Sequence, residues 1–417
     1  MDVSQKIELL SKIYGEMPIL PGRYVDYQEL LVRYNDELKN DRGKEVTQSD
    51  LRSVIAAANL KSKIEPNYVY KGLEFKAIRI VFPTTKVSAY DHLMAFAVFP
   101  NDEQTGEIGY NFAIKQLANL ALHEDWFYGT YDDGRYQILK NYFQQTFLRL
   151  QVEDEEHKND QTWTPKILFA ERNAIFNTGL VDEVYEPIYA VFNKNPNKLD
   201  SRKWVFWKFM PYMDKQRQLI TRIFGGESKL PLPAHYYDNT SELVYDIKAE
   251  IGTINIAHFI DNCYRLPLEF LRENHPQFDY DRIHDKLFYE ELAESIKADR
   301  RSMTRFKNRF NDAIAYAIKR VHWNFKTAIP IYFPTTRKIS LLLPLALVEE
   351  DKIDVALALE ATNSGTDKRA YIAHTILTLQ MAYTDARLIT RPDSDWLVAK
   401  GIVVKKQQDD AFDEIED

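Results

Sequence analysis

The sequence KILFAERNAIFNTGLVDEVYEPIYAVF occupies residues 166–192 and contains three short runs of apolar, aromatic and β-branched residues. The runs cover residues 166–169, 174–177 and 188–192, and their length and composition are typical of buried strands. The last two are separated by residues 178–187, a spacing that fits a wide hairpin. This stretch therefore predicts a β-rich segment in the middle of the chain.

Helices and strands follow one another irregularly on both sides of this segment. Because there is no regular βαβ alternation, we expect an α+β fold in which one large domain mixes α and β structure. Residues 151–164 are acidic and polar and predict an exposed loop. Further strands are predicted at residues 204–209, 339–347 and 355–359, and the last two are expected to pair as a hairpin. Helices are predicted at residues 112–123, 136–150, 214–224, 254–264, 304–323 and 381–389.

The N-terminal part, residues 1–82, predicts a small winged-helix-like module. Three segments with helical spacing of apolar residues precede a strand at 77–82, which is the outline of a winged helix. Any small helical subdomain gives the same pattern. The large domain is then expected at residues 83–400, with a charged helical insertion near 268–303 and an acidic, disordered tail at 401–417.

Composition limits the class of protein. A chain of 417 residues is too long for one ordinary core, and its formal charge of −8 argues against a general nucleic-acid coater. The single cysteine, Cys263, cannot form an internal disulfide, which fits a reducing compartment. The longest apolar run, residues 339–348, is about half of a membrane span, so we expect a cytoplasmic protein without membrane contact.

Standard catalytic and cofactor motifs are absent. The sequence has no GxxxxGK[ST], GxGxxG, HExxH or GxSxG pattern, and its nine histidines include no pair spaced i, i+4. We therefore predict no cofactor and no metal site.

Several basic segments could hold phosphate. Arg301, Arg305 and Arg309 recur along one helical face, with Arg320 further on, although such a face is commonly only solvated. Lys326 lies at a helix-to-strand junction, in the segment that begins with Asn324, where a structural lysine is the alternative.

A second candidate segment begins at Thr378, which can cap the helix that follows it. Tyr383, Arg387 and Arg391 then recur every four residues, a spacing that suits a stacked base and its phosphate. The alternative is that Arg387 pairs with a buried acid.

Asn177 begins an Asn-Thr-Gly sequence at the end of a predicted strand. Short polar side chains and backbone N–H groups at such a place can hold a ligand. The same sequence is also an ordinary turn.

A collinear series of segments resembles the family of domains of unknown function numbered 3825. The resemblance runs from about Trp126 to Leu397 and is carried by residues 139–143, 176–180, 187–190, 233–234, 237, 243–246, 324–330, 341–345 and 375–396, with Asn255, His258, Asn262, Arg265 and Pro267. The sequence departs from the family pattern at Ile331, Ser340, Gln380, Thr384 and Asp385. Members are bacterial and fungal and often stand beside LOTUS-type winged helices or cold-shock folds, so the resemblance implies a setting in RNA metabolism.

The leading hypothesis is an RNA- or nucleotide-binding protein whose large domain holds a phosphate. Tyr383 is expected to offer a stacking face. Charge and hydrogen bonds are expected from Lys326, Arg320, Arg387, Arg391, Asn177, Asn255, Asn262 and Asn324.

Two alternatives remain open. One is an enzyme acting on nucleotides or RNA ends, with His258 as general acid or base and Lys326 stabilising charge. A histidine at such a place is more often a buried structural residue. The other is a protein-interaction scaffold that docks a partner through the N-terminal module and the acidic tail.

Overall fold

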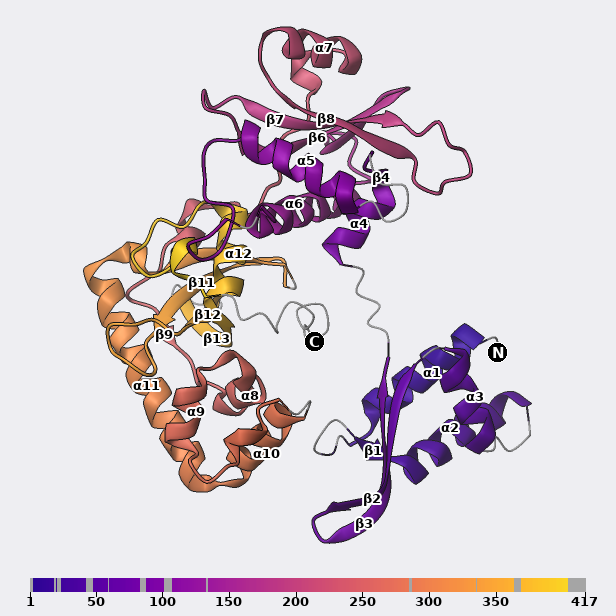
Figure 1. Ribbon diagram of the computed structural model, residues 1–417, viewed down its shortest axis with the longest axis vertical. Helices are drawn as coiled ribbons and strands as arrows, with labels where there is room; N and C mark the ends of the chain where they lie inside the picture. Colours follow the sequence, from indigo (N-terminus) through magenta and orange to yellow (C-terminus); the bar gives the residue numbers. More distant parts are fainter. Residues whose placement is uncertain are drawn as a thin grey trace. The chain divides into compact units, whose positions relative to one another are not determined.

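The computed structural model describes residues 3–18, 20, 24–42, 48–58, 60–82, 88–100, 107–132, 134–284, 287–334, 336–363 and 369–403. Within these residues the chain forms twelve α-helices and three β-sheets, which confirms the α+β class (Figure 1). By packing, the chain divides into two compact units, residues 1–86 with 275–303 and residues 87–274 with 304–417. The predicted acidic tail lies almost entirely outside the described residues.

The N-terminal elements are three helices and a small three-stranded sheet, in an order that agrees with the predicted winged-helix-like module. They run α1 (Val3–Glu16), β1 (Val25–Asp26), α2 (Tyr27–Arg42), α3 (Gln48–Ala57), β2 (Lys61–Tyr70) and β3 (Leu73–Val81). The strands form an antiparallel sheet in the order β1-β3-β2. Buried residues of the helices and of β3, among them Leu10, Tyr34, Leu51 and Ile78, make one core.

The sequence prediction found β3 but not its partner β2. In β2, KSKIEPNYVY, charged residues and a proline interrupt the apolar pattern. Pro66 is tolerated because the register shifts between Glu65 and Tyr68, which places it in a bulge where no ladder donor is required. The turn to β3 uses Lys71 and Gly72 with positive φ angles of 51° and 78°.

The first sheet of the second unit has the order β4-β8-β7-β6-β5. Its strands are β4 (Ala97–Val98), β5 (Ile167–Phe169), β6 (Asn173–Val181), β7 (Pro187–Lys194) and β8 (Trp204–Pro211). The helices α4 (Ala89–Phe96), α5 (Glu107–Leu120) and α6 (Gln137–Glu156) lie on one side, and α7 (Asp214–Phe224) lies on the other (Figure 1). The strands predicted from residues 166–192 are confirmed, and β6 pairs antiparallel with β7.

The second sheet has the order β10-β11-β12-β13-β9. Its strands are β9 (Glu250–Ile251), β10 (Ile329–Phe333), β11 (Lys338–Leu345), β12 (Val355–Asn363) and β13 (Arg369–Thr378), antiparallel except for β13 with β9. The predicted hairpin of residues 339–347 and 355–359 is confirmed as β11 and β12. The remaining helices are α8 (Ile256–Asp261), α9 (Leu268–Asn274), α10 (Phe288–Ala298), α11 (Arg300–Trp323) and α12 (Leu379–Ile389).

One hydrophobic core joins both sheets of this unit. It contains Phe143 of α6, Phe176 of β6, Leu342 of β11 and Ala382 of α12 among many others. The helix α6 thus contributes to the packing of both sheets. None of the helices within the described residues combines the length and the apolar character that crossing a bilayer requires.

A β-bulge between Asn177 and Val181 interrupts the β6–β7 ladder. The Asn177 Oδ1 accepts a hydrogen bond from the Gly179 N–H at 2.9 Å, and the Thr178 hydroxyl donates to the Ile188 carbonyl at 2.7 Å. Gly179 has a φ of +74°, and a Cβ added there would lie 2.4 Å from the Tyr142 hydroxyl oxygen. A glycine is therefore required both by its backbone angle and by the close approach of α6.

We predict that Gly179→Ala destabilises the protein, because the left-handed backbone angle alone costs a non-glycine residue about 1–2 kcal/mol and the clash adds to it. In the double variant with Tyr142→Phe the hydroxyl is gone, so the loss is expected to be smaller than the sum of the two single losses. Urea unfolding midpoints measure both effects. Strictly additive losses would show that the contact with Tyr142 is relaxed without cost.

Candidate functional site

Part of the predicted phosphate site surrounds one small pocket at the C-terminal end of α12. The pocket has a volume of about 200 Å³ and is lined by Glu124, Asp125, Tyr383, Arg391, Asp393 and Lys400, together with apolar and small residues. These side chains come from the segment that follows α5, from α12 and from the segment after α12. The pocket thus forms only when two distant parts of the sequence meet, residues 124–125 and residues 383–400.

Arg387 does not face this pocket as a free cation. Its guanidinium forms a bidentate pair with Glu124, in which Nε lies 2.8 Å from Oε1 and Nη2 lies 2.8 Å from Oε2. The two side chains are only 11% and 6% exposed. The guanidinium also lies 4.8 Å from the ring centres of Trp126 and Tyr142. The structure therefore favours the alternative for Arg387, a pair with a buried acid.

Tyr383 forms a wall of the pocket rather than a stacking platform. Its side chain is 3% exposed and meets the ring of Tyr128 edge to face at 6.1 Å. Burial, with the nearby Glu124 carboxylate adding to it, raises the pKa of Tyr383 to about 12, so its hydroxyl stays protonated. A base cannot stack on a ring that is packed on the protein interior, and the predicted stacking role has no exposed face to use.

The cations around the pocket differ in their pairing. Lys326 lies 2.8 Å from Asp393, and the two side chains are 54% and 87% exposed. Their hydrogen bond raises the pKa of Lys326 and lowers that of Asp393. Lys400 pairs with Asp125 at 3.1 Å. Arg391 follows the end of α12 at Ile389, and it makes no hydrogen bond or ion pair with the residues that the structure describes.

Local structure explains how Lys326 and α12 are positioned. Asn324 caps a short 3₁₀ turn over Phe325–Thr327 by accepting the Lys326 N–H at 3.1 Å, so its amide serves the backbone. The Trp396 Nε1 donates to the Thr327 carbonyl at 2.9 Å and ties this turn to the segment after α12. Thr378 caps α12 as predicted, with its hydroxyl accepting the Met381 N–H at 3.3 Å.

His258 and its neighbours form a separate group on α8. Asn255 caps this helix by accepting the His258 N–H at 3.2 Å, and the Asn262 side chain donates to the His258 carbonyl at 3.0 Å. Burial lowers the pKa of His258, and His374 and Arg265 act in the same direction, so the imidazole is neutral at pH 7. Neither His258 nor these neighbours line the pocket, and no hydrogen bond or ion pair joins His258 to Lys326 among the described residues.

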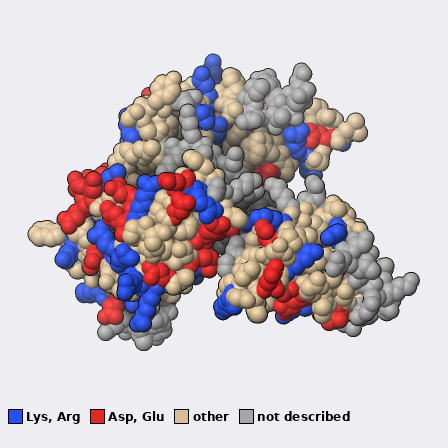
Figure 2. Space-filling view, turned by 60° about the horizontal axis from the view of Figure 1, so that its bottom comes forward, with Lys and Arg blue, Asp and Glu red and all other residues tan. Residues whose placement is uncertain are grey.

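The remaining predicted residues also lie away from the pocket. Asn177 belongs to the β-bulge described above and is 5% exposed. Arg320 lies half-buried on α11 and does not line the pocket. On the same helix the Arg309 guanidinium donates to the Leu347 carbonyl at 2.5 Å. On the face shown in Figure 2, blue and red side chains are intermixed over much of the described surface, as expected for a solvated charged surface.

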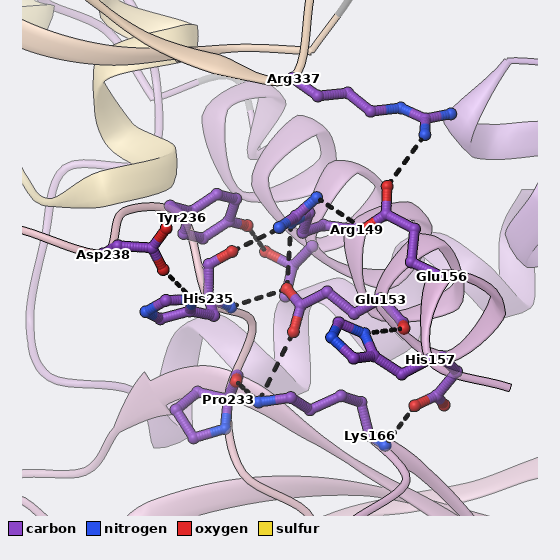
Figure 3. A network of polar contacts seen from close by, with 12 residues as sticks. Arg149, Glu153, Glu156, His157, Lys166, Pro233, His235, Tyr236, Asp238 and Arg337 are labelled. Atoms are coloured by element: carbon purple, nitrogen blue, oxygen red, sulfur yellow. Dashed lines mark hydrogen bonds and ion pairs between the residues drawn. The ribbon is translucent and has the colours of Figure 1, made fainter. Parts of the chain in front are cut away.

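A buried charge network was not predicted from the sequence (Figure 3). Glu153 of α6 is 2% exposed, and its Oε1 lies 3.0 Å from the Arg149 Nε and accepts the His235 N–H at 2.8 Å. The Lys166 Nζ lies 3.6 Å from the other oxygen and donates to the Pro233 carbonyl at 2.9 Å. The network fastens the loop that contains Pro233 and His235 to α6, which is a structural role.

The prediction of an exposed loop at residues 151–164 is wrong in its first part, because α6 continues to Glu156. The sequence contains a pattern that indicates the longer helix. Leu139, Phe143, Thr146, Leu150 and Glu153 continue one buried helical stripe, and the last of them is charged. A charge in that position requires buried partners, which the sequence alone does not identify.

Among the described residues, no three side chains of His, Cys, Asp or Glu gather into a group that could hold a metal ion. Cys263 is buried.

The buried Glu124–Arg387 pair predicts a large stability effect. Glu124→Leu leaves a buried guanidinium without a partner, and we expect the free energy of unfolding to fall by about 3–5 kcal/mol. The double variant Glu124→Leu/Arg387→Met is expected to lose less than the single variant, because no buried charge remains.

Urea unfolding measures both losses, and the matched control is Glu227→Leu. Glu227 also pairs with an arginine, since the Arg217 Nη2 donates to both of its carboxylate oxygens, but these side chains are 60% and 51% exposed, so little change is expected. Equal losses at the two glutamates would contradict the role given to burial.

Comparison with known proteins identifies a family without a known activity. A family model described as Domain of unknown function (DUF3825) matches residues 117–396, about two thirds of the chain and nearly the range over which the resemblance was seen. No curated protein and no solved structure matches the chain. The matched range includes α6, every strand of the two sheets of the second unit except β4, and most of the residues around the pocket. The chain therefore belongs to the DUF3825 family.

Proposed function

We propose that this protein binds RNA or a nucleotide, in the setting of RNA metabolism, and that the pocket at the end of α12 holds a phosphate group. The observation that carries the proposal is that Tyr383 and Arg391 line one pocket and that Lys326 pairs with Asp393, which lines the same pocket. All three residues are phosphate-site candidates of the sequence analysis, and Lys326 comes from a different segment than Tyr383 and Arg391.

The charges of the pocket are suited to an exchange of anions. Asp393 is the present partner of Lys326, and both side chains are more than half exposed. Exposed ion pairs contribute little to stability, so an incoming phosphate can displace the carboxylate at small cost. A phosphate has more acceptor oxygens than a carboxylate and can also reach Arg391, whose guanidinium suits two oxygens at once.

The pocket also limits what it can recognise. A volume of about 200 Å³ accommodates a phosphate and part of a sugar but not a whole nucleotide. The buried ring of Tyr383 gives the phosphate a water-poor wall, which strengthens charge–charge contacts on that side. The base of a bound nucleotide would therefore lie outside the pocket.

The alternative of an enzyme that uses His258 gains no specific support from the geometry. The groups that act on the His258 charge are Asp261, His374 and Arg265, and none of them lines the pocket. A general acid or base must come within hydrogen-bond reach of the reacting atom, and a phosphate held at Lys326 and Arg391 does not place one beside His258.

We predict that the protein binds adenosine 5′-monophosphate more tightly than adenosine, as measured by isothermal titration calorimetry. The double variant Lys326→Ala/Arg391→Ala is expected to lose affinity for the monophosphate by about tenfold or more, because two charged hydrogen-bond donors disappear. The control Lys307→Ala/Lys352→Ala removes two exposed lysines elsewhere, and its affinity should stay unchanged. Equal affinity for adenosine and the monophosphate would refute a phosphate site.

A second prediction concerns the resident anion. Asp393→Asn removes the carboxylate that competes with phosphate for Lys326, so the affinity for adenosine 5′-monophosphate is expected to rise by about two- to fivefold. If the Lys326–Asp393 pair were needed to shape the pocket, the same variant would bind more weakly. The sign of the change in the calorimetric dissociation constant thus separates the two roles.

A further inference from the structure

A second concave surface lies on the α7 side of the first sheet in the second unit. It is a groove of about 630 Å³ at the end of β6 and β7, bordered by Ile223 of α7 and by Trp207 of β8. The helix α7 covers the neighbouring part of this sheet face through Ile220 and Phe224, which pack on Val191. The groove is the part of that face which α7 leaves open.

The groove is positively charged without local compensation. Arg172, Lys194 and Lys198 line it, and none of its lining residues is an Asp or a Glu. All three cations are exposed, and within the described part of the chain they form no side-chain hydrogen bond or ion pair. In a chain with a formal charge of −8, a groove lined by three unpaired cations is a local exception that favours an anionic partner.

An exposed tryptophan stands beside these cations. Trp207 is 39% exposed and occupies a β-bulge, because Val191 pairs with Lys208 and Phe192 pairs with Phe206, which leaves Trp207 unpaired between them. A bulge redirects the side chain of the extra residue. The Lys208 Nζ lies 5.0 Å from the centre of the indole and adds a further positive charge.

Amides complete the rim of the groove. The Asn173 Nδ2 donates to the Asn193 Oδ1 at 2.8 Å, and the Asn195 Nδ2 donates to the Arg202 carbonyl at 2.8 Å. The Asn193 amide hydrogens are left without an acceptor among the described residues. Amide groups at this position can bond a sugar hydroxyl or the edge of a base.

We propose that this groove binds single-stranded RNA, with backbone phosphates on Arg172, Lys194 and Lys198 and an unpaired base stacked on Trp207. A cationic track beside an exposed aromatic ring is the arrangement that single strands require, since their bases are free to stack on the protein. In a duplex the bases stack on one another and leave Trp207 without a partner. The amides favour RNA over DNA because only RNA has a 2′-hydroxyl.

This inference extends the proposed function, because it adds a second surface and makes the ligand a polymer. It shares the ligand class with that proposal but uses none of the residues of the α12 pocket. The two sites are separable by ligand size. A mononucleotide tests the pocket, whereas an oligonucleotide is needed to reach several cations and Trp207 together.

The test measures fluorescence anisotropy of a labelled uridine oligonucleotide, about 12 nucleotides long, with the full chain at several salt concentrations. The variant Arg172→Ala/Lys194→Ala/Lys198→Ala is expected to bind at least tenfold more weakly at low salt. The slope of log affinity against log salt concentration should be smaller in magnitude by about 2, because each of the three lost phosphate contacts contributes about 0.7 to that slope for a single strand. The control Lys215→Ala/Arg222→Ala/Lys229→Ala removes the same charge from on or near α7 and should leave both values unchanged.

Trp207→Ala is expected to weaken binding by about fivefold or more without changing the salt dependence, and Trp207→Phe should restore most of the loss. Equal affinity for an RNA duplex, tighter binding of the DNA oligonucleotide, or equal affinity for polyglutamate would each overturn the assignment. So would an unchanged salt dependence in the triple variant. Binding of adenosine 5′-monophosphate tests only the α12 pocket. Its loss in every variant would contradict the proposed function but not the groove, and its persistence in the triple variant would show that the groove mutations leave the pocket intact.

Discussion

The burial of α6 is the constraint on which the large domain depends. This helix packs Phe143 and Phe147 into the core that both sheets share, and the same buried face ends at Glu153. A carboxylate in that position is stable only when cations and N–H groups surround it, and Arg149, Lys166 and the His235 N–H do so. The loop at Pro233 and the start of β5 are thereby fixed to the helix that joins the two sheets.

The cations of this protein differ in whether an acid faces them, and this difference separates structural from available charge. Arg149 and Arg387 are held by buried glutamates and contribute to folding. Lys326 is held by an exposed aspartate that a ligand can displace. Arg172, Lys194 and Lys198 border a groove that contains no acid. The cations are thus increasingly available to a phosphate in that order. The order depends on which acids lie nearby and not on whether the residue is Lys or Arg.

Local patterns predicted much of the fold because they depend on neighbours in the sequence. The strands around residues 174–177 and 188–192 and the hairpin of β11 and β12 were found from runs of apolar residues. The strand β2 was missed because charges and Pro66 break its pattern, and a bulge in the ladder accommodates that proline. The last turns of α6 were missed because an acidic segment is ordinarily exposed, and only its distant partners keep Glu153 buried.

In the candidate site, too, the sequence identified local features, whereas the contacts between distant residues depended on the fold. The sequence by itself determined the α+β class, the three N-terminal helices with the strand that follows them, the membership of the DUF3825 family and the positions of the phosphate-site candidates. It did not determine which of them meet, because the pairs of residues 124 with 387 and 326 with 393 form only when α12 packs against β10 and α6. Tertiary structure decided that Arg387 is neutralised by Glu124, that Arg391 lines a pocket and that Lys326 pairs with Asp393 of that pocket. A charge's partners depend on distances in space that the sequence does not contain.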